Sequence, residues 1–446
     1  MMGRLSVQEA LFYQLRLEDF IPPDHLLRRI DQVLCFDDIR PQLAALYSQV
    51  GRPSIDPELM IRMLLVGYLY GIRSETRLCE EVHLNLAYRW FCRLGLEGRV
   101  PDRSSFSKNR HGRFAQGDVL RSVFEMVVRR CMDVGLVGGA GALVDGSTVE
   151  ADANRDKRAA PGDLQAAWRM ADEVTRPVRA YLEQLDAEAS EGRDGPAHPP
   201  PKVISQTDPQ AAWSTKDGPG RFSYETNYLV DDQNAIIVDV EATPARLSQE
   251  IVAAKAMLER SRDRVGFAPT SLAADKSYGT APFLAWLLEK NVTPFVPVLD
   301  RKAQTDGKLT RDAFAYDRAR DCFVCPEGHD LTLRSITPET GVKRYRPTAS
   351  ACRHCPRKSD CTDGSTRSLV RLVDEDARQS VRDLASTAAY AVARARRKKV
   401  EMLFAHMKRY LKLRRLRLRG LAGATEEFLL AATAQNLKRL VKLTSV

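Results

Sequence analysis

Three acidic residues stand where carboxylates could take part in metal-assisted chemistry. Asp145 lies inside a short apolar run, Asp275 lies near the end of another, and Glu401 is the only acid between residues 389 and 425. A carboxylate in an apolar strand costs desolvation energy unless it is paired or binds a cation. Two divalent ions about 4 Å apart require carboxylates from several elements. Taken singly, each acid could equally be a helix cap, a turn residue or a surface ion-pair partner.

Cations surround Glu401 on its expected helix. Arg397 lies one turn before Glu401 and Lys408 lies two turns after it, so a helix places all three on one face. This combination suits a site that binds a metal and also meets DNA phosphates. The alternative is an ion pair between Arg397 and Glu401, worth only about 0.3–0.5 kcal/mol. The other faces are apolar and can pack on a sheet through Val400, Leu403, Phe404 and Met407.

Five of the nine cysteines lie between residues 322 and 361. Cys322 and Cys325 form one CxxC hook, Cys352 and Cys355 form a second, and Cys361 follows six positions later. Each hook can present two thiolates to a tetrahedral zinc ion, so spacing alone favours the two hooks as ligands. The alternative is a cysteine-rich loop whose reduced thiols only pack. The remaining cysteines lie in helical apolar patterns that predict core positions: Cys35, Cys79, Cys92 and Cys131.

Residues 1–130 are expected to be helical. Residues 56–72 carry apolar side chains at helical spacing, and Asp56-Pro57 is a typical helix start. A second helix is expected from Ser74 to Gly95, and a third after residue 101. Short helices with tight turns fit a helix-turn-helix module as well as a plain bundle.

From residue 138 to 300 the pattern predicts an α/β fold, a mixed sheet flanked by helices. Strands are expected at 143–149, 221–231, 235–244 and 293–298, with a hairpin turn at 231–234, and 271–279 is expected to be a strand that ends in a turn. Helices are expected at 163–186, 248–266 and 281–291. The Gly-, Pro-, Ala- and acid-rich stretch 186–201 predicts a disordered loop. A cysteine-rich insertion, 301–374, and a long helix from about Glu375 to Leu413 follow.

Positive charge concentrates near the C-terminal end of the sequence. Residues 389–446 carry fifteen Lys and Arg against three acids, whereas the rest of the chain carries 53 basic and 55 acidic side chains. The net charge of +10 therefore comes from this segment. Clustered Lys and Arg favour a polyanionic partner, because phosphate contacts release counterions. The alternative is a solvated helix face or a solubility tail.

Length and composition narrow the class of protein. With 446 residues and 44% hydrophobic side chains, the chain can form two or three domains with a substantial core. We find no signal-peptide pattern, no apolar run of membrane-spanning length and no P-loop motif. An odd number of cysteines argues against a secreted disulfide scaffold. We therefore expect a cytoplasmic protein with no membrane partner.

These features together resemble the DDE transposases of bacterial insertion sequences, in the branch with a Tyr-x2-Arg-x3-Glu-x6-Lys signature on the last catalytic helix. Arg397, Glu401 and Lys408 fit that spacing, whereas the Tyr position holds Arg394. Tyr390, one turn earlier on the same face, is a candidate substitute.

Other segments resemble the same family in the same order. VDGSTVEA around Asp145 and ADKSYG around Asp275 resemble its first and second acid motifs, and TDPQAAW at 207–213 is similar to the stretch between them. The segments beginning GRPSIDPELMIRML and PDRSSFSKNR resemble the helical domain before the core. The resemblance covers nearly the whole chain.

The resemblance implies a ribonuclease H-like core in residues 138–300, an all-α N-terminal DNA-binding domain in 1–130, and a catalytic Glu helix with basic C-terminal helices in 375–446. Asp145, Asp275 and Glu401 would be the catalytic acids and the ligands of Mg²⁺ or Mn²⁺, and Arg397 and Lys408 would contact DNA. Similar transposases carry a CP…CxxC…C arrangement in a zinc-ribbon-like insertion. That implies a structural zinc held by Cys325, Cys352, Cys355 and Cys361, with Cys322 left spare.

The implied function is cut-and-paste transposition of an insertion sequence: metal-dependent hydrolysis at the transposon ends, then strand transfer to target DNA. The implied partners are double-stranded terminal repeats and target DNA, bound by a homo-oligomer. The alternative is a catalytically inactive, transposase-derived DNA-binding protein, which the departure at Arg394 favours and the presence of all three acids disfavours. A housekeeping nuclease is disfavoured by the N-terminal domain and the basic C-terminal segment.

Overall fold

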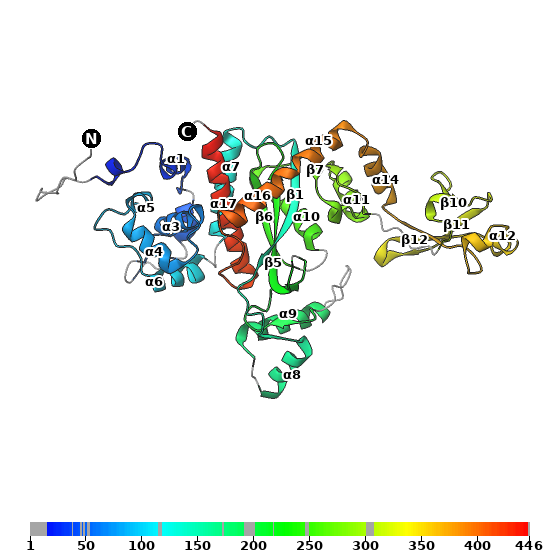
Figure 1. The fold of residues 1–446 in the computed structure, drawn as a ribbon, viewed down its shortest axis with the longest axis horizontal. Coiled ribbons are helices and arrows are strands. Elements are labelled where there is room, and N and C mark those ends of the chain that lie inside the picture. The colour runs from blue at the N-terminus through cyan, green and yellow to red at the C-terminus, as the bar shows by residue number, and fades with distance from the viewer. Residues whose placement is uncertain are drawn as a thin grey trace, which may run out of the picture.

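The computed structural model describes residues 16–37, 39–44, 47, 50, 54–114, 118–171, 174–190, 201–216, 218–245, 249–299 and 307–444. A helical region lies beside a central sheet, and a small separate sheet holds the cysteine-rich residues (Figure 1). The helices α8 (Pro161–Ala171) and α9 (Arg176–Ser190) project away from the central sheet as a further unit.

The N-terminal region is helical, as the periodicity predicts. Asp56 caps the helix α3 by accepting a hydrogen bond from a backbone amide of the first turn. The single helix predicted from Ser74 to Gly95 is wrong, because the Asn85 side chain caps a second helix within that run. The helices of this region are α1 (Leu26–Val33), α2 (Ile39–Ala44), α3 (Pro57–Leu69), α4 (Glu75–Leu84), α5 (Leu86–Phe91), α6 (Arg103–Asn109) and α7 (Val119–Asp133).

The central sheet is mixed, with strand order β4-β5-β1-β7-β8, and β6 also pairs with β5. β5 runs antiparallel to β1, β4 and β6, whereas β7 is parallel to β1 and β8 is parallel to β7. The hairpin predicted around residues 231–234 is confirmed as the turn between β5 and β6. The strands are β1 (Gly141–Glu150), β4 (Ala212–Ser214), β5 (Arg221–Asp231), β6 (Ile237–Pro244), β7 (Ser271–Ala273) and β8 (Thr293–Phe295).

The helix α17 (Gly420–Leu443) joins the helical region to the sheet, since it packs on α3, α7 and β6. Its Asn436 amide donates to the Ile237 carbonyl at 2.7 Å and accepts from the Ile237 amide at 2.9 Å, which satisfies the backbone of β6. Most of α17 is buried, so this part of the basic segment is a core helix and not a solvated tail. None of the described helices, α17 included, is long and apolar enough to span a membrane.

Two further helices pack against the sheet. α10 (Gln249–Val265) contacts β5 and β6, and α11 (Ala281–Glu289) contacts β8. The strand that was expected to end in a turn within 271–279 is confirmed: the strand is short, and the turn begins at Asp275.

The long helix predicted from Glu375 to Leu413 is three helices: α14 (Glu375–Leu384), α15 (Ala388–Arg396) and α16 (Lys398–Arg409). Thr387 interrupts the run because its hydroxyl caps α15. α15 packs beside β8 and α16 beside β1. The break between them therefore allows two consecutive helices to pack on two different strands of the sheet. A segment of turns and bends, 411–419, then leads into α17.

The peripheral units are small. The helix predicted at 163–186 is the pair α8 and α9, joined to a two-stranded sheet of β2 (Arg158–Ala159) and β3 (Ile204–Ser205). Of the loop predicted at 186–201, residues 186–190 belong to α9 and 191–200 lie outside the described residues. The cysteine-rich insertion contains β9 (Ala315–Asp317), β10 (Cys322–Val324), β11 (Asp330–Thr337), β12 (Val342–Arg346), α12 (Ala349–Arg353), α13 (Lys358–Cys361) and β13 (Leu369–Leu372).

A buried carboxylate, Glu427 of α17, ties the helical region to the start of the last helix. Its Oε1 accepts hydrogen bonds from the backbone amides of Arg417 at 2.5 Å and Leu418 at 2.6 Å. Its Oε2 forms an ion pair with Arg73, from the loop after α3, and lies 3.4 Å from the Tyr68 hydroxyl. Only 1% of Glu427 is exposed, so these partners compensate a charge that water does not reach.

Glu427→Ala should therefore lower the free energy of unfolding by about 3–5 kcal/mol, the usual loss when one partner of a buried ion pair is removed. Urea denaturation measures this change. Glu259→Ala is the matched control, because Glu259 forms only an exposed pair with Lys290 at 3.7 Å and should cost less than about 1 kcal/mol. Equal losses for the two variants would contradict this role of Glu427.

Candidate active site

Asp145 and Asp275 occupy equivalent positions on neighbouring parallel strands. Residues 141–143 of β1 pair with residues 271–273 of β7, and each aspartate follows the last pair of this ladder by two residues. Parallel strands present their carboxyl ends at the same edge of a sheet. The two side chains consequently lie close enough for the charge of Asp275 to raise the pKa of Asp145.

Asp145 resists ionisation at this edge. Burial is the largest cause, and the negative charges of Asp275 and Glu250 add to it. A hydrogen bond from the Gly146 amide at 2.9 Å and the positive charge of Arg397 act in the opposite direction. The balance raises the pKa of Asp145 to about 6. A carboxyl whose pKa is shifted by burial and a specific charged neighbour is typical of functional sites.

Asp275 is held by the turn that ends its strand. It caps a short 3₁₀ turn, Lys276–Tyr278, which follows the strand. Its Oδ1 accepts hydrogen bonds from the Ser277 amide at 2.8 Å and from the Ser277 hydroxyl at 2.5 Å. The local backbone therefore fixes the carboxylate at the carboxyl end of β7.

Glu401 is connected to this edge of the sheet by Arg397, which contacts both the Glu401 carboxylate and the backbone before Asp275. On α16, the side chains of Val400, Leu403 and Met407 are buried, and the ring of Phe404 stacks on Tyr228 of β5 with centroids 5.3 Å apart. This packing leaves 64% of the Glu401 side chain exposed.

Arg397 stands at the junction of α15 and α16 and connects the acids. One terminal nitrogen lies 3.9 Å from the Glu401 carboxylate, and the other lies 3.5 Å from the carbonyl of Ala274, the residue before Asp275. Its charge also lowers the pKa of Asp145. The structure thus brings Asp145 and Asp275 together directly and links Glu401 to them through a cation.

The remaining signature positions have different surroundings. Lys408 is partly buried two turns beyond Glu401 on α16, and Arg394 is exposed on α15. Tyr390 is buried, with its ring edge against Phe295 of β8 at a centroid distance of 6.1 Å, so it packs α15 onto the sheet.

Sequence reasoning missed four polar residues around these acids. Glu225 of β5 is almost completely buried, and Glu250 lies in the first turn of α10; the Lys216 ammonium is 3.1 Å from the first and 3.3 Å from the second. Tyr278 is buried, and the charges of Glu250, Asp145, Asp275 and Glu225 add to burial in raising its pKa. Glu225 lies inside the predicted strand 221–231, but that stretch is rich in polar residues, so Glu225 did not stand out there as Asp145 did in its apolar run.

The fit of this edge to a divalent cation is partial. The described residues contain no group of three or more His, Cys, Asp or Glu side chains that could hold a metal ion. Two carboxylates do approach each other, and carboxylate oxygens are the ligands that Mg²⁺ and Mn²⁺ prefer. The Tyr278 hydroxyl is buried near them without a hydrogen-bond partner among the described residues. Such a group costs about 1–3 kcal/mol, which a hydrated cation at the acids would relieve.

Four cysteines of the insertion influence one another electrostatically, but among the described residues no three of them are grouped closely enough to hold a metal ion. Burial raises the pKa of Cys361, Arg367 opposes this shift, and the charges of Cys352, Cys355 and Cys325 raise the pKa further, so these three sulfurs lie near Cys361. Cys322 is instead buried on β10. All described cysteines are free thiols.

The segment 411–419 exposes a row of cations. Its leucines are buried, whereas the alternating basic residues Lys412, Arg414, Arg415, Arg417 and Arg419 are exposed. The backbone of this segment pairs with the end of β1: the Leu416 amide donates to the Glu150 carbonyl at 2.7 Å. Arg419 also pairs with Asp152 at 3.0 Å. The row therefore follows the end of β1 on the protein surface.

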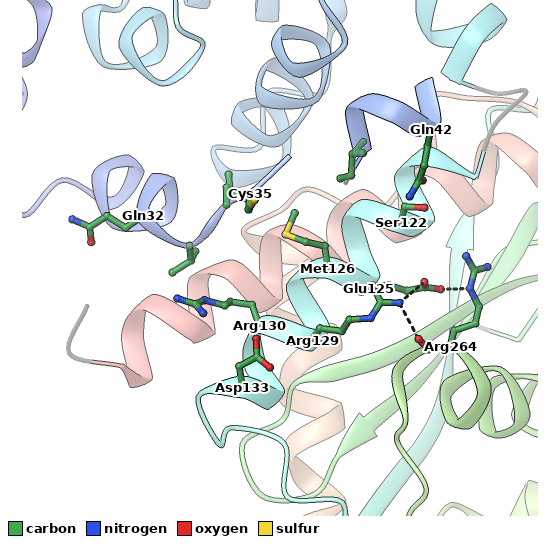
Figure 2. A pocket seen from close by; sticks show the side chains of 13 residues that line it. Gln32, Cys35, Gln42, Ser122, Glu125, Met126, Arg129, Arg130, Asp133 and Arg264 are labelled. Atoms are coloured by element: carbon green, nitrogen blue, oxygen red, sulfur yellow. Dashed lines mark hydrogen bonds and ion pairs between the residues drawn. The ribbon is translucent and has the colours of Figure 1, made fainter. Parts of the chain in front are cut away.

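A cavity of about 620 Å³ lies away from these acids, between α7, the residues after α1 and the end of α10 (Figure 2). Its wall includes Glu125, Arg129 and Arg264, joined by ion pairs, and apolar Met126. None of the predicted catalytic acids lines it, so the cavity is separate from the candidate active site.

Comparison with known proteins supports the class of protein suggested by this site. Residues 15–112 match the family described as Transposase domain (DUF772), and residues 324–441 match the family described as Transposase DDE domain. Two parts of the chain are thus similar to transposase families, and the second matched part contains Glu401 whereas Asp145 and Asp275 lie outside both.

Among solved structures, the piggyBac transposase synaptic complex with hairpin DNA is similar at a TM-score of 0.34 and 10% identity, covering 93% of this chain and 72% of that chain.

The raised pKa of Asp145 predicts a pH-dependent change in stability. Above about pH 6 the ionised carboxylate destabilises the folded state, whereas well below the ordinary pKa of 3.8 it is protonated in both the folded and unfolded states. In the presence of a chelator, Asp145→Asn should therefore raise the free energy of unfolding by about 3 kcal/mol at pH 7.5 and by only about 0.5 kcal/mol at pH 4.

Denaturant titrations at the two pH values measure this difference. Asp263→Asn is the control, because Asp263 is exposed beside Arg262 and its pKa is lowered. A gain for Asp145→Asn that is equal at both pH values would show that ionisation is not its cause.

Proposed function

We propose that this protein is a cut-and-paste DNA transposase of an insertion sequence, with the central sheet as a ribonuclease H-like catalytic core. The observation that carries the proposal is the register of β1 and β7, which brings Asp145 beside Asp275, with Arg397 linking both to Glu401. The two matched transposase domains support the same conclusion.

Asp145, Asp275 and Glu401 are proposed to hold Mg²⁺ or Mn²⁺. When bound, these ions supply activation of the attacking oxygen and stabilisation of the leaving oxygen of a phosphodiester. Asp145 and Asp275 contribute from a rigid sheet edge, where backbone and cap hydrogen bonds orient them. Glu401 contributes from an exposed helix face, and it must exchange its contact with Arg397 for the ion.

The basic residues are proposed to hold DNA at this edge. Arg397 and Lys408 share the helix that carries Glu401, so they would contact phosphates near the scissile bond. The row of cations in 411–419 would extend this surface along the end of β1. The partners are then double-stranded terminal repeats and target DNA, with the helical domain, residues 1–130, contributing to end recognition and a homo-oligomer pairing the two ends.

The insertion is proposed to contain a structural zinc site. Cys325, Cys352, Cys355 and Cys361 share one electrostatic neighbourhood, and four thiolates are a common tetrahedral zinc set. Cys322, which spacing alone includes, is buried elsewhere on β10 and is left out.

Replacing any of Asp145, Asp275 and Glu401 by Ala should abolish Mg²⁺-dependent cleavage at the terminal repeats and leave binding to terminal DNA within about twofold of wild type. Cleavage and gel-shift assays on the repeats that flank the reading frame measure both. Glu289→Ala, an exposed acid on α11, is the control and should cleave normally.

Two outcomes would change this proposal. Cleavage that survives the loss of one acid removes that residue from the catalytic set. The second outcome is a wild-type protein that binds the repeats but does not cut them when Mg²⁺ is supplied. That result would favour the inactive DNA-binding alternative, for which exposed Arg394 is the specific observation.

For the insertion, metal analysis of purified protein should find about one zinc per chain. Cys352→Ser should lower the zinc content and the stability of the insertion, because a tetrahedral site loses one of its four ligands. Cys322→Ser is the matched control and should keep the zinc. Loss of zinc from Cys322→Ser together with full retention in Cys361→Ser would favour the two-hook ligand set.

A further inference from the structure

Asp275 has a second polar neighbourhood on the side away from Arg397. The Ser277 hydroxyl lies 2.5 Å from Asp275 Oδ1 and 3.0 Å from Glu250 Oε2. The Ser277 amide also donates to Oδ1, at 2.8 Å. The single hydroxyl hydrogen is shared between the two carboxylates, with the shorter contact to Asp275, whereas the amide hydrogen goes to Asp275 alone. Together these donors set the rotation of the Asp275 carboxylate.

Glu250 is itself held in place from a different element. The Lys216 ammonium, in the segment after β4, lies 3.3 Å from Glu250 Oε1 and 3.1 Å from Glu225 Oε1. Burial opposes the charge of Lys216, but these two carboxylates still raise its pKa above the ordinary value. Glu250 therefore uses one oxygen for Lys216 and the other for Ser277.

The contacts form one chain from Glu225 of β5 through Lys216 and Glu250 to Ser277 and Asp275. Its members come from β5, the segment after β4, α10 and the turn after β7, so it ties the Asp275 turn to three other elements of the fold. Ser277 itself is exposed, so packing does not fix its side chain. The hydrogen bonds with Asp275 and Glu250 must do so.

We propose that Ser277, held in its side-chain rotamer by Glu250, is a positioning residue that orients the Asp275 carboxylate for cation binding. The inference rests on the proposed function of Asp275. Ser277 and Glu250 do not bind the ion: they restrict Asp275, in the way that hydrogen-bonded partners orient metal ligands elsewhere. Removal of such partners commonly weakens metal affinity 10- to 100-fold.

The test is titration of Mn²⁺ into the intact, metal-stripped protein, followed calorimetrically without DNA. Ser277→Ala should weaken the Asp275-dependent site about 10-fold, and Ser277→Thr, which restores a hydroxyl, should return the affinity close to wild type. Glu250→Ala should weaken the site similarly. Because Glu250 acts through Ser277, adding Glu250→Ala to Ser277→Ala should cause little further loss.

Ser105→Ala is a matched control in the helical region. Ser105 also donates its amide and hydroxyl to an aspartate, Asp102, at 2.9 and 2.7 Å, but away from the acids of the sheet. It should leave Mn²⁺ affinity unchanged, and thermal melting confirms that each variant is folded.

The outcomes separate this inference from the function on which it rests. If Asp275→Ala leaves Mn²⁺ binding unchanged, the proposed metal site fails. If Asp275→Ala removes binding while Ser277→Ala does not weaken it, only the positioning role is overturned. If the losses from Ser277→Ala and Glu250→Ala multiply in the double variant, Glu250 acts on the ion independently, and the proposed chain is also overturned.

Discussion

The parallel pairing of β1 with β7 places two carboxylates at one edge of the sheet, and the surrounding elements compensate their mutual repulsion. Burial and like charge act against ionisation of Asp145, and Arg397 acts for it. The broken helix makes this compensation possible. α15 packs on β8 through Tyr390, and α16 packs on β1 and β5 through residues that include Phe404, so their junction carries Arg397 to the strand ends.

A second constraint fixes the path of the exposed cations. Glu427 binds the amides of Arg417 and Leu418 and pairs with Arg73, which ties the segment 411–419 to the helical region. Gly71 has a φ of +68°, and a side chain there would meet Lys412 at 3.1 Å, so the loop after α3 and this segment approach closely. The helical region and the basic row are therefore held in one frame beside the acids.

The sequence predicted elements whose signals are local. The cap at Asp56, the turn between β5 and β6 and the short strand around Asp145 depend on neighbouring residues, and the structure confirms them. The unbroken helix from Glu375 to Leu413 was wrong, because its breaks serve packing against distant strands. Charge composition also misled: the basic excess suggested a surface segment, yet most of α17 lies in the core.

The candidate site shows the same division. Asp145 and Asp275 were found because each interrupts an apolar run, and Glu401 because its helix spacing matches a family signature. Glu250 and Lys216 lie in ordinary polar sequence, and only the fold reveals that they meet beside Ser277. For the cysteines, spacing favoured the two CxxC hooks, whereas the family resemblance replaced Cys322 with Cys361. Spacing cannot show that the Cys322 side chain is buried on β10.

The central claim is that Asp145, Asp275 and Glu401 serve one metal site. Anomalous scattering from Mn²⁺ in crystals of the wild-type protein bound to its terminal DNA tests it most directly. The account predicts an anomalous peak that contacts all three carboxylates, with Glu401 turned away from Arg397. Mn²⁺ bound at Asp145 and Asp275 with Glu401 still paired to Arg397, or no Mn²⁺ at this edge, would contradict it.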